Sequence, residues 1–205
     1  MAVYRLTRYP RQVELDGGQT VMLRPMVQGD VPVVSEFFAR LPEMDRFFLK
    51  EDVASAAVVR GWGTNLNYDR ALPLLAFEGD RVVADSVLFR HRGGYRQHLG
   101  GIRVSVAPEL ASTNLASVLM RDLIEIAWDS ELEGAELELV DQAQDQLIKA
   151  AEDLGAVRIA TVARAVKDSH GEPRDLVFLR IPLGRSWEWW KVLNEFLTPE
   201  TALTP

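Results

Sequence analysis

Two hydrophobic periods alternate along this chain of 205 residues, and their order restricts the fold more than any other feature of the sequence. Apolar residues at every second position predict strands, and apolar residues at every third or fourth position predict helices. In chain order they predict strand, helix, helix, three strands, helix, strand, helix and two strands. Helices set among hairpins exclude an all-β sandwich and a regular doubly wound sheet. The pattern therefore predicts an α+β (mixed α/β) domain with a largely antiparallel sheet.

Seven segments have the strand pattern and four have the helical one. The predicted strands are 19–24, 73–77, 82–89, 97–106, 135–140, 158–166 and 175–181. The predicted helices are one that follows Asp30 and ends at Leu41, one over 50–62, one that begins at Asn114 and one over 144–154. Asp30 is a favourable N-cap for the first of them. We expect one domain over residues 19–183, an N-terminal leader over 1–18 and a C-terminal tail over 184–205.

The composition excludes several kinds of functional site. The chain has no cysteine, which excludes disulfides, thiolate catalysis and cysteine-ligated metals. Its three histidines have no i, i+4 spacing, so we expect no metal cofactor. A net charge of −7 argues against a partner that is a nucleic acid. The chain contains no run of about 18 apolar residues, so no membrane span is predicted. No secretory signal is recognisable, so we expect a cytoplasmic location.

A strand that ends in Val-Ser-Val-Ala-Pro-Glu, residues 104–109, stands directly before a long amphipathic helix. Together with the element order and the Leu-Arg-Pro-Met of residues 23–26, this arrangement resembles the GNAT acyltransferases over residues 19–183. The resemblance implies a seven-stranded sheet flanked by about four helices. It also implies transfer of an acetyl group from acetyl-CoA, by direct attack of an amine. The acceptor would be an amine-bearing small molecule, or the N-terminus or a lysine of a protein.

The junction between that strand and that helix has a physical use of its own. The first N–H groups of a helix have no partner within the helix, and the helix dipole makes its N-terminus positive. Such an end binds anions, including a pyrophosphate. The resemblance assigns acetyl-CoA binding to Val104, Ser105, Val106, Ala111, Ser112, Thr113, Asn114, Leu115 and Ala116.

This loop departs from the family pattern, which reads Q/R-x-x-G-x-G/A. Ala116 fits the last position, but Ala111 replaces the long polar residue and Asn114 replaces the first glycine. The Cβ and amide of Asn114 occupy space that a phosphate would need, yet Ser, Thr and Asn side chains also offer hydrogen-bond donors. The same three residues are equally suited to capping a helix. A further departure is Ala151, which stands where many family members have a tyrosine that protonates the leaving thiolate.

Two residues are candidates for the general base. His98, near the start of the strand that faces the acyl group, belongs to the side-chain type whose ordinary pKa of about 6.5 suits this role. It would act through water, or it is a solvent-exposed histidine at a strand start. Glu138, on the predicted strand 135–140, either points into the active-site cleft or belongs to a solvated strand face. Asp85 is unusual because it interrupts an otherwise apolar strand.

Two further features carry alternatives. The basic hairpin 90–98 either meets an acidic partner or the 3′-phosphate of CoA, or is a solvated loop. The tail contains Trp187, Trp189 and Trp190, and we expect a Trp-rich helix that docks on the domain or on a second subunit of a homodimer. The alternative to an enzyme is a GNAT-fold protein that has lost catalysis and serves as a ligand-binding or protein-interaction module.

Overall fold

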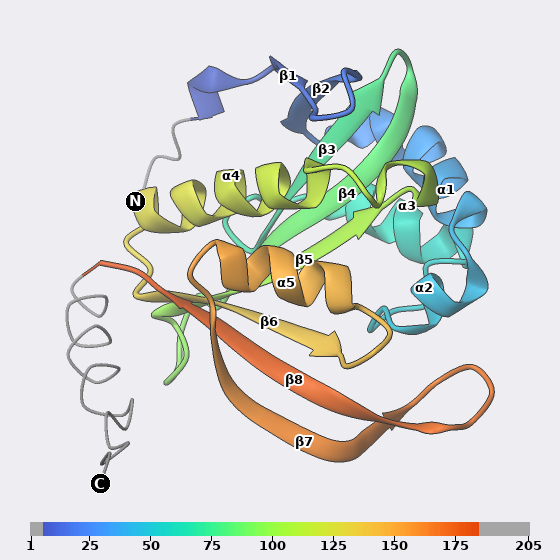
Figure 1. Cartoon of the computed structure of the whole chain (residues 1–205). Coiled ribbons are helices and arrows are strands. Elements are labelled where there is room, and N and C mark those ends of the chain that lie inside the picture. The colour runs from blue at the N-terminus through green and yellow to red at the C-terminus, as the bar shows by residue number, and fades with distance from the viewer. Residues whose placement is uncertain (1–5, 185–205) are drawn as a thin grey trace, which may run out of the picture.

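The computed structural model describes residues 6–184 and centres on one sheet (Figure 1). Over these residues the sheet has eight strands in the order β1-β2-β3-β4-β5-β6-β8-β7. All neighbouring strands are antiparallel except β5 and β6, which are parallel. The expected α+β class with a largely antiparallel sheet is confirmed.

The elements have the following bounds. The strands are β1 (Arg11–Glu14), β2 (Thr20–Pro25), β3 (Ala71–Glu78), β4 (Arg81–Arg90), β5 (Leu99–Val106), β6 (Gly134–Val140), β7 (Val157–Lys167) and β8 (Pro173–Pro182). The α-helices between residues 6 and 184 are α1 (Val31–Arg40), α2 (Glu43–Phe47), α3 (Ala56–Thr64), α4 (Leu115–Asp129) and α5 (Asp145–Asp153). Short 3-10 helices cover Leu6–Arg8, Gln28–Asp30 and Pro108–Leu110.

The predicted counts of seven strands and four helices need correction. Strand β1 lies inside the expected leader and pairs with β2 at the sheet edge. Its four residues alternate too briefly to be recognised as a strand. Helix α2 has five residues, too few for a helical period, and α3 begins at Ala56 rather than at residue 50. The expected Trp-rich helix falls within 185–205, outside the described residues.

Helices cover the sheet on both faces. Helices α4 and α5 lie on one face, and α1 and α3 lie on the other (Figure 1). Strands β3 and β4 run through the middle and are buried over nearly their whole length. Strands covered on both faces read as continuous apolar runs rather than as alternating patterns. The apolar run of β4 is interrupted by Asp85, which is 1% exposed.

Asp30 precedes α1 as predicted, but its side chain does not cap that helix. It accepts two hydrogen bonds from the guanidinium of Arg24, both 2.6 Å long, and one of 2.8 Å from the N–H of Val27. Burial alone would raise the pKa of Asp30, but these hydrogen bonds and the charge of Arg24 outweigh it, so the pKa lies below its ordinary value. The carboxylate ties the end of β2 to the turn before α1.

Replacing Asp30 with asparagine is expected to lower the free energy of unfolding by about 2 kcal/mol at pH 7. A carboxyl group whose pKa is depressed by folding stabilises the protein above its unfolded pKa, about 3.9. That contribution disappears as the pH falls through the lower folded pKa. Urea unfolding of both proteins at pH 7 and pH 2.5 measures this, and an equal difference at both pH values would contradict the assignment.

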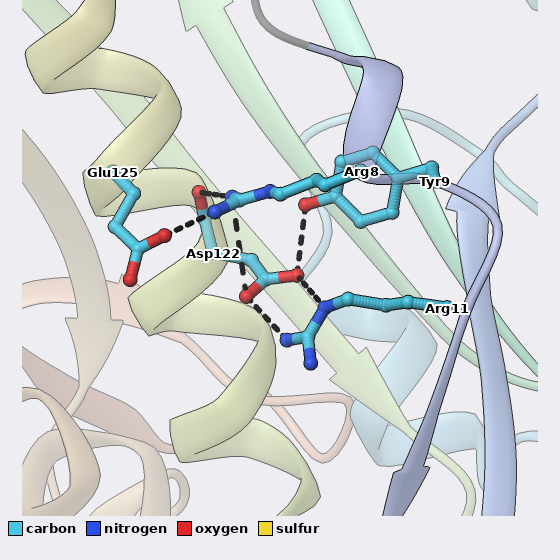
Figure 2. A network of polar contacts seen from close by, with 5 residues as sticks. All are labelled: Arg8, Tyr9, Arg11, Asp122 and Glu125. Carbon is cyan, nitrogen blue, oxygen red and sulfur yellow. Dashed lines mark hydrogen bonds and ion pairs between the residues drawn. The ribbon is translucent and has the colours of Figure 1, made fainter.

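A buried carboxylate on α4 holds the N-terminal segment against the domain (Figure 2). Asp122 accepts hydrogen bonds from Arg11, at 2.6 and 3.2 Å, and from the hydroxyl of Tyr9, at 2.8 Å. Arg8 donates to the backbone oxygen of Asp122 and pairs with Glu125. Burial, followed by the charge of Asp122, raises the pKa of Tyr9, so its hydroxyl remains a donor. These contacts position β1 and the hairpin that β1 forms with β2.

Candidate active site

Strands β5 and β6 separate after a short stretch of pairing. Their parallel register covers three residue pairs and ends at Gly101 opposite Glu136. Strand β5 then continues to Val106 with no partner on the side of β6. Backbone N–H and C=O groups left without a partner strand must bond to something else, so this stretch is available to a ligand.

A cavity of about 760 Å³ opens at the split between the two strands. It is lined by the end of β5, by residues of 111–117 at the start of α4 other than Leu115, by residues of the segment 142–153 that includes α5, and by Asp16, Leu41, Asp45 and Leu49. Its volume lies in the range typical of small-molecule and cofactor sites.

The structure brings the predicted cofactor residues together, with one exception. The residues that line the cavity are Val104, Ser105, Val106, Ala111, Ser112, Thr113, Asn114 and Ala116. Leu115 does not line it, because this first residue of α4 is fully buried in the hydrophobic core. The binding role of all nine residues stays a prediction.

The loop before α4 uses part of its hydrogen-bonding capacity internally. The hydroxyl of Thr113 donates to the carbonyl of Leu110 at 2.7 Å and accepts the N–H of Leu115 at 3.3 Å. Asn114 has φ −77°, an ordinary backbone conformation. A glycine at position 114 is therefore not required by the backbone, and the effect of Asn114 on a bound phosphate would come from its volume and its amide.

A second feature of this helix end was not predicted from the sequence. Asp16, in the turn between β1 and β2, accepts a 3.2 Å hydrogen bond from the N–H of Asn114. Its own N–H lies 3.4 Å from the side-chain oxygen of Asn114. The carboxylate thus occupies part of the position where the α4 N-terminus would attract an anion. In the sequence, Asp-Gly-Gly at residues 16–18 indicates only a turn, and 98 residues separate the partners.

The charges around the cavity are mostly negative. Four aspartates line it against a single lysine: Asp16, Asp45, Asp145 and Asp153, with Lys149. A polyanion such as CoA would therefore bind with less electrostatic help than a basic site provides. The split strand and the volume fit the pantetheine part of acetyl-CoA, whereas the charges at the loop fit its pyrophosphate poorly.

The two predicted bases, His98 and Glu138, lie outside this cavity. His98 is exposed just before β5, at the opposite end of that strand from the cavity, and only its backbone carbonyl bonds, to the N–H of Glu133. Glu138 on β6 forms an ion pair with Lys50 at 2.7 Å. Neither side chain is among those that line the first cavity or the second one described next. The structure therefore does not bring His98 and Glu138 together, and although Glu138 lies on β6 beyond the stretch paired with β5, neither side chain lines the cavity at the split.

A second cavity, of about 630 Å³, lies between α3 and strands β3, β4 and β5. On its lining, Asp85 and Arg103 form an ion pair of 2.9 Å. The guanidinium carbon of Arg103 lies 5.0 Å from the ring centre of Trp62 and 5.6 Å from that of Phe89. Burial raises the pKa of Asp85, and the charge and hydrogen bond of Arg103 act in the opposite direction. The sequence had marked Asp85 as unusual, and Arg103 is the partner that it required.

Lining residues of the two cavities are neighbours on β5. Ser105 lines the first cavity and Arg103 lines the second. Side chains two positions apart on a strand share a face and lie about 7 Å apart. In the antiparallel pair of β4 and β5, Ser105 stands opposite Asp85. A group held at the split is therefore next to the inner end of the second cavity.

Three absences hold for residues 6–184. Neither cavity has a tyrosine among its lining residues, and Ala151 is fully buried in α5. No cluster of three or more histidine, aspartate or glutamate side chains arranged to hold a metal ion occurs in this described part. No helix in it has the length and apolarity needed to span a bilayer.

The fold is shared with solved acetyltransferases, although no protein-family model and no curated protein sequence matches the chain. A GNAT acetyltransferase from Streptococcus pneumoniae superposes with a TM-score of 0.69 at 16% identity, over 80% of this chain and 99% of that one. The GNAT domain of the S. lividans protein PAT gives 0.68 at 20% identity, over 84% and 96%. A ribosomal-protein-alanine N-acetyltransferase from Brucella melitensis gives 0.67 at 18% identity, over 78% and 99%. The expected fold is confirmed.

Proposed function

We propose that this chain, which has the fold of the GNAT acetyltransferases, is an N-acyltransferase that transfers an acetyl group from acetyl-CoA to an amine. The observation that carries the proposal is the split between β5 and β6, which opens into a cavity beside the N-terminus of α4. A partly unpaired strand next to a helix N-terminus supplies the two things that an acyl thioester on a nucleotide carrier needs: backbone groups for the arm and a positive helix end for the phosphates.

The chain's own residues would take distinct parts. Backbone groups of β5 between Val104 and Val106 would hold the arm and polarise the thioester carbonyl. The first turn of α4 would face the pyrophosphate, with Lys149 as the nearby cation. Acetyl-CoA itself supplies an acyl group with a thiolate leaving group.

The transfer requires no covalent intermediate on the protein. The amine nitrogen forms a bond to the carbonyl carbon, the carbon–sulfur bond breaks, and the nitrogen loses one proton while the thiolate leaves. His98 and Glu138 would take that proton only through water, because neither lines a cavity. A missing acid or base slows such a reaction by about 10²–10⁴-fold rather than abolishing it.

The acceptor class is an amine on a small molecule, or the N-terminus or a lysine of a protein. The names of structural neighbours span this range: one is a ribosomal-protein-alanine N-acetyltransferase, and another is a chimera that includes a spermidine N-acetyltransferase from Vibrio cholerae. Both acceptor types belong to the proposal.

The carboxylate of Asp16 at the loop before α4 favours a second function. Asp16 occupies the helix end that a pyrophosphate would use, and no tyrosine in either cavity lining offers an acid. A GNAT-fold module that binds a ligand or partner without acyl transfer would keep the cavity and tolerate both features.

Calorimetry with acetyl-CoA, followed by an assay of free CoA release with a panel of amines, separates the two functions. For the enzyme we expect binding in the micromolar range and amine-dependent release of CoA. Absence of binding at ~1 mM would refute the transferase, since KM values for enzymes lie mostly between about 1 μM and 1 mM. Binding without release for any amine would favour the module.

A further inference from the structure

The second cavity is elongated along β4. Asp85, Val87 and Phe89 alternate along one face of this strand and line the cavity, and Arg90 and His91 line it where the strand ends. The six residues of extended strand from Asp85 to Arg90 span about 17 Å. The cavity therefore has two distinct ends, one beside the split and one at the edge of the sheet.

The inner end carries an excess of carboxylate. Asp85 pairs with Arg103, and the guanidinium of Arg103 lies over the ring of Trp62. The indole N–H of Trp62 in turn donates to a carboxylate oxygen of Glu51 at 3.0 Å. The inner end thus holds two carboxylates and one guanidinium: Asp85 is paired with Arg103, and Glu51 is bonded to the indole that Arg103 stacks on. A cationic group such as an ammonium is favoured there.

Two arginines lie at the outer end of the cavity. Arg70 and Arg90 both line the cavity, and the N–H of Arg90 donates to the carbonyl of Arg70 at 2.8 Å. Burial, followed by the charge of Arg92, lowers the pKa of Arg90, as expected where cations gather. An acidic group on a ligand is favoured there.

The walls between the two ends are mainly apolar. They include Ala57, Val58, Trp62, Leu66, Val87 and Phe89. A hydrocarbon segment of a ligand would lie against these side chains and leave water.

We propose that this cavity binds the acceptor, and that it selects primary amines that carry an acidic group at the far end of an apolar chain. The inference rests on the proposed acyltransferase function, because it needs the amine to reach a thioester at the split. The polarity is consistent with that need: the carboxylate-rich end, which attracts the ammonium, is the end beside Ser105. The arginine-rich end holds the acidic group away from the reacting atoms.

Three acceptors of equal chain length test the selection: 8-aminooctanoate, octylamine and 1,8-diaminooctane. They differ only in the group opposite the reacting amine, which is a carboxylate, a methyl group or an ammonium. We expect the KM for 8-aminooctanoate to be about tenfold lower than that for octylamine, and the KM for the diamine to be the highest. Calorimetry with 8-aminooctanoate, without acetyl-CoA, measures the same preference independently of turnover.

Arg70→Gln is the matched variant, because the side chain of Arg70 is exposed and its loss leaves no buried charge unpaired. An exposed ion pair contributes little, so we expect about a fivefold weaker binding of 8-aminooctanoate and unchanged binding of octylamine. Arg60→Gln, on the exposed face of α3 and outside the cavity lining, is the control and should change neither.

The outcomes separate this inference from the proposed function. Turnover of all three amines with equal KM values, and no effect of Arg70→Gln, would overturn the acceptor selection and leave the transferase intact. Binding of 8-aminooctanoate that depends on Arg70, without release of CoA for any amine, would overturn the transferase and keep the cavity as a ligand site.

Discussion

Asp16→Asn is expected to tighten the binding of acetyl-CoA about tenfold. The carboxylate of Asp16 accepts the N–H of Asn114 at the helix end that faces the cavity. Two like charges about 4 Å apart repel by roughly 1 kcal/mol in water and by more near a protein surface. A gain of about 1.4 kcal/mol corresponds to a tenfold change in Kd. Asparagine keeps an oxygen that can accept the same hydrogen bond, so the loop geometry is retained.

Acetyl-pantetheine is the control ligand for this variant, because it carries the thioester without the nucleotide and its pyrophosphate. Its affinity should be the same for Asp16→Asn and for the unaltered protein. Asp80→Asn, in the exposed turn between β3 and β4, removes the same charge far from the cavity lining and should leave acetyl-CoA binding unchanged. An equal gain for both ligands, or no gain for acetyl-CoA, would show that Asp16 does not oppose the pyrophosphate.

Asp122→Ala is expected to lower the free energy of unfolding by about 2–4 kcal/mol. The Asp122 side chain is 4% exposed and is the common acceptor for Arg11 and Tyr9 (Figure 2). Removing one partner of a buried ion pair costs about 3–5 kcal/mol. The loss here is smaller because Arg8 and Arg11 are about one third exposed and water can solvate them. The midpoint of urea unfolding measures the change.

Glu125→Ala provides the comparison on the same helix. Glu125 also pairs with an arginine, but it is 51% exposed, so its loss should change the free energy of unfolding by less than about 0.5 kcal/mol. Equal effects of the two substitutions would refute the role of Asp122. Because Asp122 holds the segment that leads to Asp16, its loss should also relax the contact between Asp16 and Asn114 and strengthen acetyl-CoA binding.

Periodicity predicted the interior of the fold well. The central strands β3 and β4 and the helix α4 carry long apolar patterns, since each buries a large surface in the same core. The short elements β1 and α2 escaped prediction because four or five residues do not display a period. Asp30 illustrates a different limit: its position before a helix was predicted, but its partners Arg24 and Val27 come from the preceding strand and turn.

The candidate site likewise contains residues that the sequence indicated and residues that it did not. The strand that ends at Val106 shortly before α4 is a local feature on which the family resemblance depended. That resemblance assigned cofactor binding to 104–106 and 111–116, and all of these residues except Leu115 line the first cavity. His98 and Glu138 were chosen by strand position and residue type, and the structure gives them other surroundings. Asp16 and the pair of Asp85 with Arg103 depend on residues 98 and 18 positions apart, so no local pattern could indicate them.

By itself, the sequence determined the fold class, the junction of β5 with α4 and the absence of thiol chemistry, since each depends on local spacing or on composition. Only the tertiary structure decided where the charges lie. It brought a carboxylate from the first hairpin to the helix end, and it gave the second cavity an acidic and a basic end. Electrostatic interactions depend on distance in space, and the chain sets that distance through the packing of remote segments.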